Sequence, residues 1–154
     1  MVLAAAPAVF YYEGYVPGTY ADPVGIPTAC YGETGPHIQP GMVFEHADCL
    51  AMLDAGLNRH WRGLERCLNA DITPGQAAAI LSWTYNIGIN AACTSTLARM
   101  VNAGVPGEVW CHQLTRWTKA TKMGVKIELR GLVKRRKAEL AMCLTGVWPR
   151  EIGA

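Results

Sequence analysis

Three side chains near the start of the chain have the types and spacing that acid–base chemistry requires. Glu13 ends an apolar run that is typical of a short helix, Asp22 follows nine residues later, and Thr28 lies six residues further on. The Pro-Val-Gly turn after Asp22 would fold Thr28 back towards it, because proline fixes one φ angle and glycine permits a positive one. Cleavage of a glycosidic bond needs a carboxylic acid that protonates the leaving oxygen and a carboxylate across the sugar. Glu13 and Asp22 are therefore candidates for this pair.

These residues also have plain structural explanations. A glutamate at a helix end is often a solvated charge, an aspartate before proline is common in turns, and threonine is favoured in strands. Two carboxylates by themselves are therefore weak support for catalysis. The order continues with Tyr31-Gly32 and Thr34-Gly35, and the spacing of the whole stretch is much more specific.

The next predicted element is a long helix over residues 45–68. Apolar side chains recur there at intervals of three and four residues, which places them on one helix face. They are Leu50, Leu53, Leu57, Trp61, Leu64 and Leu68. A helix of that length would span ~36 Å at 1.5 Å per residue. Residues 35–41, with two prolines and two glycines, are expected to form the loop before it.

Sharp boundary signals mark the helix that follows. In Thr73-Pro74-Gly75-Gln76, threonine can cap the helix, proline suits its first position and glutamine completes a capping box. The helix is expected to run to Ile87 and to stop at Gly88.

Weaker patterns cover the rest of the chain. Further helices are expected over residues 94–102, after Pro106, and over 131–144. Residues 118–127 are expected to form a loop or short turn, and strand signals are confined to residues 15–34. The predicted class is α+β, mainly α, with one small antiparallel sheet.

Composition and charge limit the possible functions. With 154 residues, 51% of them apolar and 17% charged, the chain can bury one core and is neither disordered nor fibrous. Residues 1–58 contain six acidic residues and no Lys or Arg, whereas nine basic residues and one acid lie between Arg116 and Lys137. The basic region is either a solvated face or a surface that attracts an anionic polymer such as a cell wall. Nucleic acid is not expected as a partner, because no recognised binding motif accompanies the charge.

Six cysteines are spread widely along the chain: Cys30, Cys49, Cys67, Cys93, Cys111 and Cys143. They form no C-x-x-C pair, and neither they nor the four histidines have metal-ligand spacing, so no metal site is expected. Disulfides in an oxidising compartment such as a bacterial periplasm explain them better than six buried thiols. Of the many possible connectivities, our hypothesis is 30–49, 67–93 and 111–143, because each bond would join neighbouring elements.

The order of Glu13, Asp22 and Thr28, with Tyr31-Gly32 and Thr34-Gly35, resembles the catalytic segment of the phage-type lysozymes, glycoside hydrolase family 24, which are endolysins. The likeness covers roughly residues 3–147. It continues through Tyr85-Asn86-Ile87-Gly88, Ser95-Thr96-Leu97, Arg116-Trp117, Gly131-Leu132-Val133, Arg135-Arg136 and Glu139.

This resemblance implies a two-lobed lysozyme-like fold in a single domain over residues 1–154. An N-terminal catalytic lobe of about 13–45 would carry the small antiparallel sheet. A connecting helix of about 45–68 would join it to a helical lobe of about 72–147. The implied activity is that of a muramidase, which hydrolyses the β-1,4 bond between N-acetylmuramic acid and N-acetylglucosamine of bacterial peptidoglycan during host lysis. It would need no cofactor and act as a monomer, made from a phage gene in the host cytoplasm and active in the periplasm.

The resemblance also implies residue roles. Glu13 would be the general acid, Asp22 would stabilise positive charge on the sugar or orient water, and Thr28 would hold the attacking water, in an inverting reaction. Cleft-lining candidates are Tyr31, Glu33, Tyr85, Asn86, Trp117 and Arg135 or Arg136. Tyr85 and Trp117 are equally well explained as core aromatics. The sequence departs from the family pattern at Glu33, where many relatives have histidine, and at Pro27, so the resemblance leaves the pH optimum open.

The apolar run over residues 2–12 is too short to span a bilayer. Some family members carry an N-terminal signal-anchor, of which this run would be the tail. We favour a domain helix, because the resemblance requires a helix directly before Glu13, and Pro7 would be tolerated in its first turn. No basic segment or cleavage site of the signal-peptide type is visible.

Two other functions remain open from the sequence. A lytic transglycosylase relies on a single glutamate, and Asp22 and Thr28 argue against it. A non-enzymatic cationic protein that binds walls or disrupts membranes would depend on the basic C-terminal region instead. Serine-hydrolase and nucleotide chemistry are unsupported, because neither G-x-S-x-G nor a Walker pattern occurs.

Overall fold

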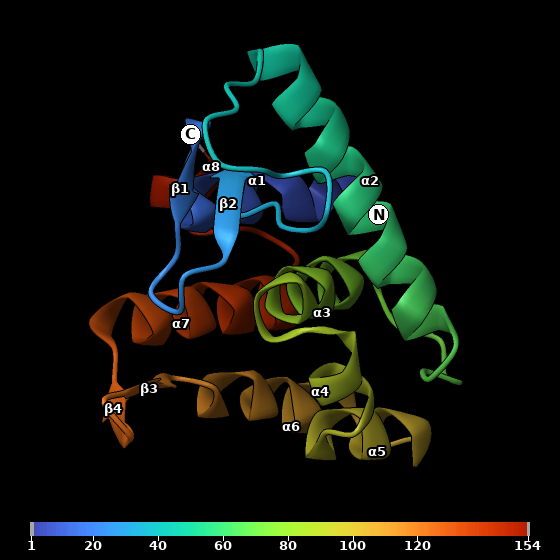
Figure 1. Cartoon of the computed structure of the whole chain (residues 1–154). Coiled ribbons are helices and arrows are strands. Elements are labelled where there is room, and N and C mark those ends of the chain that lie inside the picture. Colours follow the sequence, from blue (N-terminus) through green and yellow to red (C-terminus); the bar gives the residue numbers. More distant parts are fainter. Residues whose placement is uncertain (1, 154) are drawn as a thin grey trace.

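Helices make up most of the chain, and two short hairpins complete it. The computed structural model describes residues 2–153 (Figure 1). The elements in order are α1 (Val2–Glu13), β1 (Val16–Ala21), β2 (Pro27–Cys30), α2 (His46–Glu65), α3 (Pro74–Ile87), α4 (Ile89–Cys93), α5 (Thr96–Asn102), α6 (Gly107–Trp110), the 3₁₀ helix η1 (Cys111–Arg116), β3 (Lys119–Lys122), β4 (Val125–Glu128), α7 (Arg130–Thr145) and α8 (Arg150–Gly153). The predicted class, mainly α with a small antiparallel sheet, is confirmed.

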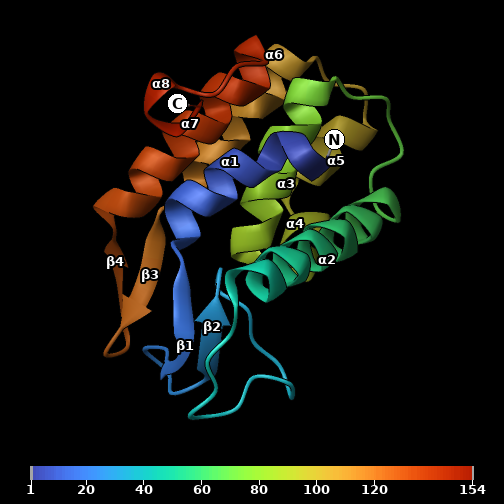
Figure 2. The same ribbon diagram turned by 90° about the horizontal axis from the view of Figure 1, so that it is seen from above.

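Helix α3 is the centre of the core. Its residues 77–84 are all buried, and it packs against α1, α2 and α7 (Figure 2). A helix buried on all sides must be apolar all round, which explains its weak periodicity. The capping box is present as predicted: Gln76 N donates to Thr73 Oγ1 at 3.2 Å, and Thr73 N donates to Gln76 Oε1 at 2.9 Å.

The long helix predicted over residues 45–68 is α2, which lies along one side of the molecule (Figure 1). It ends three residues earlier than expected, at Glu65, and Cys67 and Leu68 follow in a turn. Leu53, Leu57 and Leu64 form its buried face. None of the helices among residues 2–153 combines the length and apolar character needed to cross a membrane.

The apolar run at the start of the described chain forms α1, a helix of the domain as we favoured. Ala5, Ala8 and Val9 are fully buried. The expectation that Pro7 lies in the first turn is wrong, because α1 begins at Val2 and places Pro7 in its middle. Burial of the apolar face offsets the hydrogen bond that proline cannot donate there.

The loop predicted over residues 118–127 is wrong as well, since β3 and β4 form a hairpin. Lys119 pairs with Glu128 and Lys122 with Val125. Met123 and Gly124 both have positive φ, as a two-residue hairpin turn requires. This hairpin and the β1–β2 hairpin project from the side of the molecule away from α5 and α6 (Figure 2).

Helix boundaries after α3 also differ from the expected ones. The short helix α4 was not predicted, and α5 begins at Thr96 rather than Thr94, because Ser95 caps it by accepting a hydrogen bond from Ala98 N at 3.1 Å. Helix α8 was also not predicted.

Three disulfides have the connectivity that we hypothesised: Cys30–Cys49, Cys67–Cys93 and Cys111–Cys143. The first joins β2 to α2, the second joins the turn after α2 to α4, and the third joins η1 to α7. Each bond links elements that pack against each other, so the cysteines strengthen three separate contacts between elements.

Candidate active site

Glu13 is the last residue of α1, where the chain leaves the helix for β1. Gly14, with φ 72°, ends the helix, and its N–H donates to Phe10 O at 3.3 Å. The Glu13 side chain is about one-fifth exposed, and Arg135 Nη1 donates to its Oε1 at 2.7 Å. Its Oε2 makes no hydrogen bond within residues 2–153.

A buried network from α3 and α7 fixes this arginine. Arg135 is 3% exposed, its Nε donates to Glu139 Oε1 at 3.1 Å, and its Nη2 donates to Ser82 O at 2.9 Å. Ser82 Oγ donates to the same Glu139 oxygen at 2.8 Å. The ring of Tyr12 lies 5.4 Å from the guanidinium carbon. The guanidinium therefore has one available orientation, which points Nη1 at Glu13.

A second arginine balances the charge of the network. Arg136 Nε lies 3.1 Å from Glu139 Oε2, and Arg136 Nη2 donates to Asn86 Oδ1 at 2.7 Å. Burial raises the pKa of Glu139 and lowers the pKa of Arg136, and each charge opposes the shift of the other. Two carboxylates and two guanidiniums thus share one site, in which Glu13 is partly exposed and the other three groups are buried, and such burial is tolerable only while the charges are paired.

A tight turn after β2 brings a glycine against Glu13. Ala29 and Glu33 exchange backbone hydrogen bonds at 3.0 and 2.8 Å, and Cys30 takes a φ of 59° inside the turn. A Cβ added to Gly32, whose φ is 77°, would lie 3.2 Å from Glu13 Oε2. The Tyr31-Gly32 pair in the sequence therefore marks the point where backbone approaches the carboxylate.

Asp22 and Thr28 lie on the β1–β2 hairpin. Asp22 Oδ1 accepts hydrogen bonds from the N–H groups of Val24 and Ile26, both at 2.9 Å, whereas its Oδ2 makes none among the described residues. Thr28 is buried, pairs with Tyr20 across the hairpin and donates from Oγ1 to Ile26 O at 3.0 Å. The turn that folds Thr28 back towards Asp22 is thus present, and one oxygen of Asp22 holds that turn.

Tyr85, Tyr31 and Glu33 lie next to this site. Tyr85 Oη donates to Tyr31 O at 2.9 Å, and burial together with the nearby charges of Glu13 and Glu33 raises the pKa of Tyr85. The Tyr31 side chain is buried against Phe10, and its hydroxyl lies 3.0 Å from His46 Nε2. Glu33 is also largely buried, with Oε1 3.4 Å from His37 Nε2.

Trp117 lies in a separate groove of about 370 Å³. Its ring meets Trp83 edge to face at 6.0 Å and is 39% exposed. The groove has polar walls from Ser95, Thr96, Arg99, Gln113 and Arg116. No group of three His, Cys, Asp or Glu side chains within residues 2–153 is arranged to hold a metal ion.

Sequence reasoning missed the network that orients Arg135. Glu139 lies four residues after Arg135 and three after Arg136, so a helix over 131–144 puts the three side chains on one face, and this signal was available. Ser82 has no comparable signal, because a single serine in an apolar helix predicts nothing about its partner.

The fold and this arginine-held carboxylate define a lysozyme-like glycosidase. Residues 11–139 match the Phage lysozyme family, and the chain belongs to that family. The SAR-endolysin of Bacteriophage PS119 is 39% identical over 135 residues, which cover 87% of this chain and 77% of that protein. The SAR-endolysin of Enterobacteria phage P21 is 38% identical over 86% of this chain and 76% of that protein.

Solved structures agree with this assignment. The endolysin from Escherichia coli O157:H7 phage FAHEc1 superposes with a TM-score of 0.84 at 30% identity, over 96% of this chain and 94% of that one. The muramidase domain of SpmX from Asticaccaulis excentricus gives the same TM-score at 27% identity, over 92% and 95%. The protein is a lysozyme, an enzyme of the glycoside hydrolase class.

Proposed function

We propose that this lysozyme hydrolyses the β-1,4 bond between N-acetylmuramic acid and N-acetylglucosamine in peptidoglycan, with Glu13 as its general acid. The observation that carries the proposal is the Glu13–Arg135 pair at the end of α1. Arg135 holds Oε1 and leaves Oε2 to carry the proton. After the proton moves to the leaving oxygen, the same guanidinium stabilises the new carboxylate.

Asp22 and Thr28 complete the reaction on the other face of the sugar. Two backbone N–H groups hold Asp22 Oδ1, so its Oδ2 is free to accept the proton of the attacking water while Thr28 orients that water. The oxygen of the water bonds to the sugar carbon, and the glycosidic oxygen leaves with the proton of Glu13. This sequence inverts the configuration at that carbon.

The remaining candidate residues support catalysis or substrate binding. Tyr85 and Glu33 border the carboxylate, and Tyr31 supports Tyr85 through its carbonyl. Trp117 offers an exposed ring to a sugar or peptide in its polar groove. Asn86 acts indirectly, because it accepts a hydrogen bond from Arg136.

The molecule works as one catalytic domain, with an N-terminal lobe, a connecting helix α2 and a helical lobe. Its phage-encoded relatives support synthesis in a host cytoplasm. Three disulfides support action in an oxidising compartment, the periplasm. The enzyme acts there on the cell wall as a monomer.

The test compares the wild type with Glu13→Gln in lysis of outer-membrane-permeabilised Gram-negative cells. Removing a general acid is expected to lower the rate about 10²- to 10⁴-fold. Glu108→Gln, an exposed change on α6, is the matched control and should leave lysis unchanged. Mass spectrometry of the released muropeptides should show reducing ends. Anhydro products would indicate a transglycosylase, and undiminished lysis by Glu13→Gln would refute the assignment.

A further inference from the structure

A wide groove runs between α2 and α4, outside the residues assigned to catalysis. Its volume is about 1050 Å³. Arg59, Arg62 and Arg66 line one wall, and the amides of Asn58 and Asn90 lie beside them. Five side chains that can donate hydrogen bonds therefore surround one concave surface.

The three arginines carry charge that the protein does not balance. Their spacing of three and four residues places them on one face of the chain at the end of α2, and all three are exposed. Within residues 2–153 none of their side chains makes a hydrogen bond, and none of their guanidiniums lies within 4.0 Å of a carboxylate. The nearby carboxylate of Glu65 instead accepts from Trp61 Nε1 at 2.9 Å.

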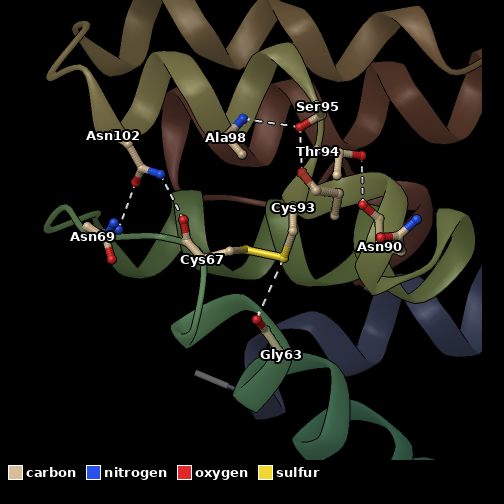
Figure 3. The surroundings of a disulfide bond; sticks show 10 residues. Gly63, Cys67, Asn69, Asn90, Cys93, Thr94, Ser95, Ala98 and Asn102 are labelled. Carbon is tan, nitrogen blue, oxygen red and sulfur yellow. Dashed lines mark hydrogen bonds between the residues drawn. A yellow bond between two sulfur atoms is a disulfide. The ribbon is translucent and has the colours of Figure 1, made fainter.

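The walls of the groove are held rigidly at the end that Figure 3 shows. The Cys67–Cys93 disulfide ties the turn after α2 to α4, and Cys93 Sγ lies 3.7 Å from Gly63 O. Asn102 clamps the same turn, because its Nδ2 donates to Cys67 O and its Oδ1 accepts from Asn69 N, both at 2.7 Å (Figure 3). A binding surface formed in advance loses little entropy when a ligand binds.

The other end of the groove lies beside the candidate active site. A Cβ added to Gly56 would be 3.3 Å from Tyr85 Cε2 and 3.7 Å from Arg59 Nη2. The Arg59 guanidinium therefore lies close to Tyr85, which borders Glu13. A polymer held at Glu13 can reach the groove over a short distance.

We propose that this groove binds carboxylate groups on the peptide side chains of peptidoglycan. The inference rests on the proposed function, since it extends the substrate site for the same polymer. Arginine suits the role because its planar guanidinium can donate two parallel hydrogen bonds to a carboxylate. Asparagine amides can hydrogen-bond to peptide groups. The lysines of the β3–β4 hairpin carry similar charge, but they stand on an exposed two-stranded projection and provide no concave wall.

The test compares two variants that each lose three positive charges. One is Arg59→Gln with Arg62→Gln and Arg66→Gln, and the matched control is Lys119→Gln with Lys122→Gln and Lys126→Gln. Each is assayed on intact Gram-negative sacculi and on glycan strands whose peptides an amidase has removed. On sacculi we expect KM to rise about tenfold in the groove variant, with kcat unchanged. The hairpin variant should change KM less than about twofold.

Peptide-free strands distinguish the outcomes. The groove variant should cleave them as the wild type does. On sacculi, about 1 M salt should abolish the difference in KM between the two proteins, because it screens the arginine charges of the wild type. Equal defects in both variants, or an equal defect on both substrates, would refute the proposal. If the groove variant folds poorly, Arg62→Gln alone should still raise KM about twofold. Failure of the muramidase proposal would differ, since the wild type would then release no reducing ends from either substrate.

Discussion

The carboxylate of Glu139 shows how one side chain far from any solvent can decide the geometry of a site. It is fully buried, and its oxygens contact Arg135, Arg136 and Ser82. Through Arg135 it sets the direction from which a guanidinium reaches Glu13. Glu139 is therefore a positioning residue, because it contacts Arg135, and Arg135 in turn contacts Glu13.

Glu139→Gln is expected to lower the free energy of unfolding by about 3 kcal/mol, because it leaves a guanidinium buried without its counter-charge. It should also lower kcat on peptidoglycan, since Arg135 is no longer held against Glu13. Urea denaturation with the disulfides intact measures the first effect and initial rates measure the second. Glu108→Gln should change neither the free energy of unfolding nor kcat. A variant that lost stability but kept full kcat would mean that Arg135 is held well enough by Ser82 alone.

At the scale of elements, α3 is important because the end of α7 packs against the residues where α3 begins. Thr73 caps it, and Gly75 lies directly against the end of α7. A Cβ on Gly75 would be 2.7 Å from Gly146 Cα and 2.9 Å from Met142 O, both backbone atoms that cannot move alone. Small residues at this crossing therefore set how closely α3 approaches α7, and so how Ser82 meets Arg135.

Two single changes separate capping from packing at this helix start. Thr73→Ala should lower the free energy of unfolding by about 1 kcal/mol through loss of the cap. Gly75→Ala should lower it by about 2 kcal/mol or more, because α7 must shift to admit the methyl group. Both are read from chemical denaturation curves. The packing argument fails if Gly75→Ala is as mild as Thr73→Ala.

At the scale of the whole molecule, the disulfides connect each part of the chain to the next. Their sequence separations are 19, 26 and 32 residues, so all three close loops of moderate size. Closing such a loop restricts the unfolded chain, which stabilises the folded state. A core of this size also contributes substantial burial of its own, so the bonds add to a fold that helices α1, α3 and α7 already define.

The double change Cys67→Ser with Cys93→Ser is therefore expected to cost about 3 kcal/mol while the helical circular dichroism spectrum is retained. Guanidinium denaturation without reductant is the measurement. Reductant should lower the midpoint of the wild type further than that of the variant, which has one bond fewer to lose. An unchanged midpoint in the variant would show that this disulfide does not stabilise the fold.

Local signals decided which elements could be predicted. Side chains that act on their own backbone are visible in the sequence, so the Thr73 capping box and the stop at Gly88 were found at the right residues. The hairpin over residues 119–128 was missed, although Val125-Lys126-Ile127-Glu128 alternates apolar and charged residues and Met123-Gly124 is a turn signal. Pro7 was predicted in the first turn of its helix but lies in the middle, because the packing of α1 against α3 offsets the hydrogen bond that proline cannot donate.

The sequence by itself determined the reaction class, the order of Glu13, Asp22 and Thr28, and a plausible disulfide pairing. These depend on residue identity and spacing along one short stretch or between neighbouring elements. Only the tertiary structure decided that Arg135 meets Glu13 across 122 residues, that Ser82 joins Glu139 in holding it there, and that Arg59, Arg62 and Arg66 share a groove with α4. The reason is physical: contacts between distant segments depend on how helices pack, and packing depends on the shape of the whole core rather than on any local pattern.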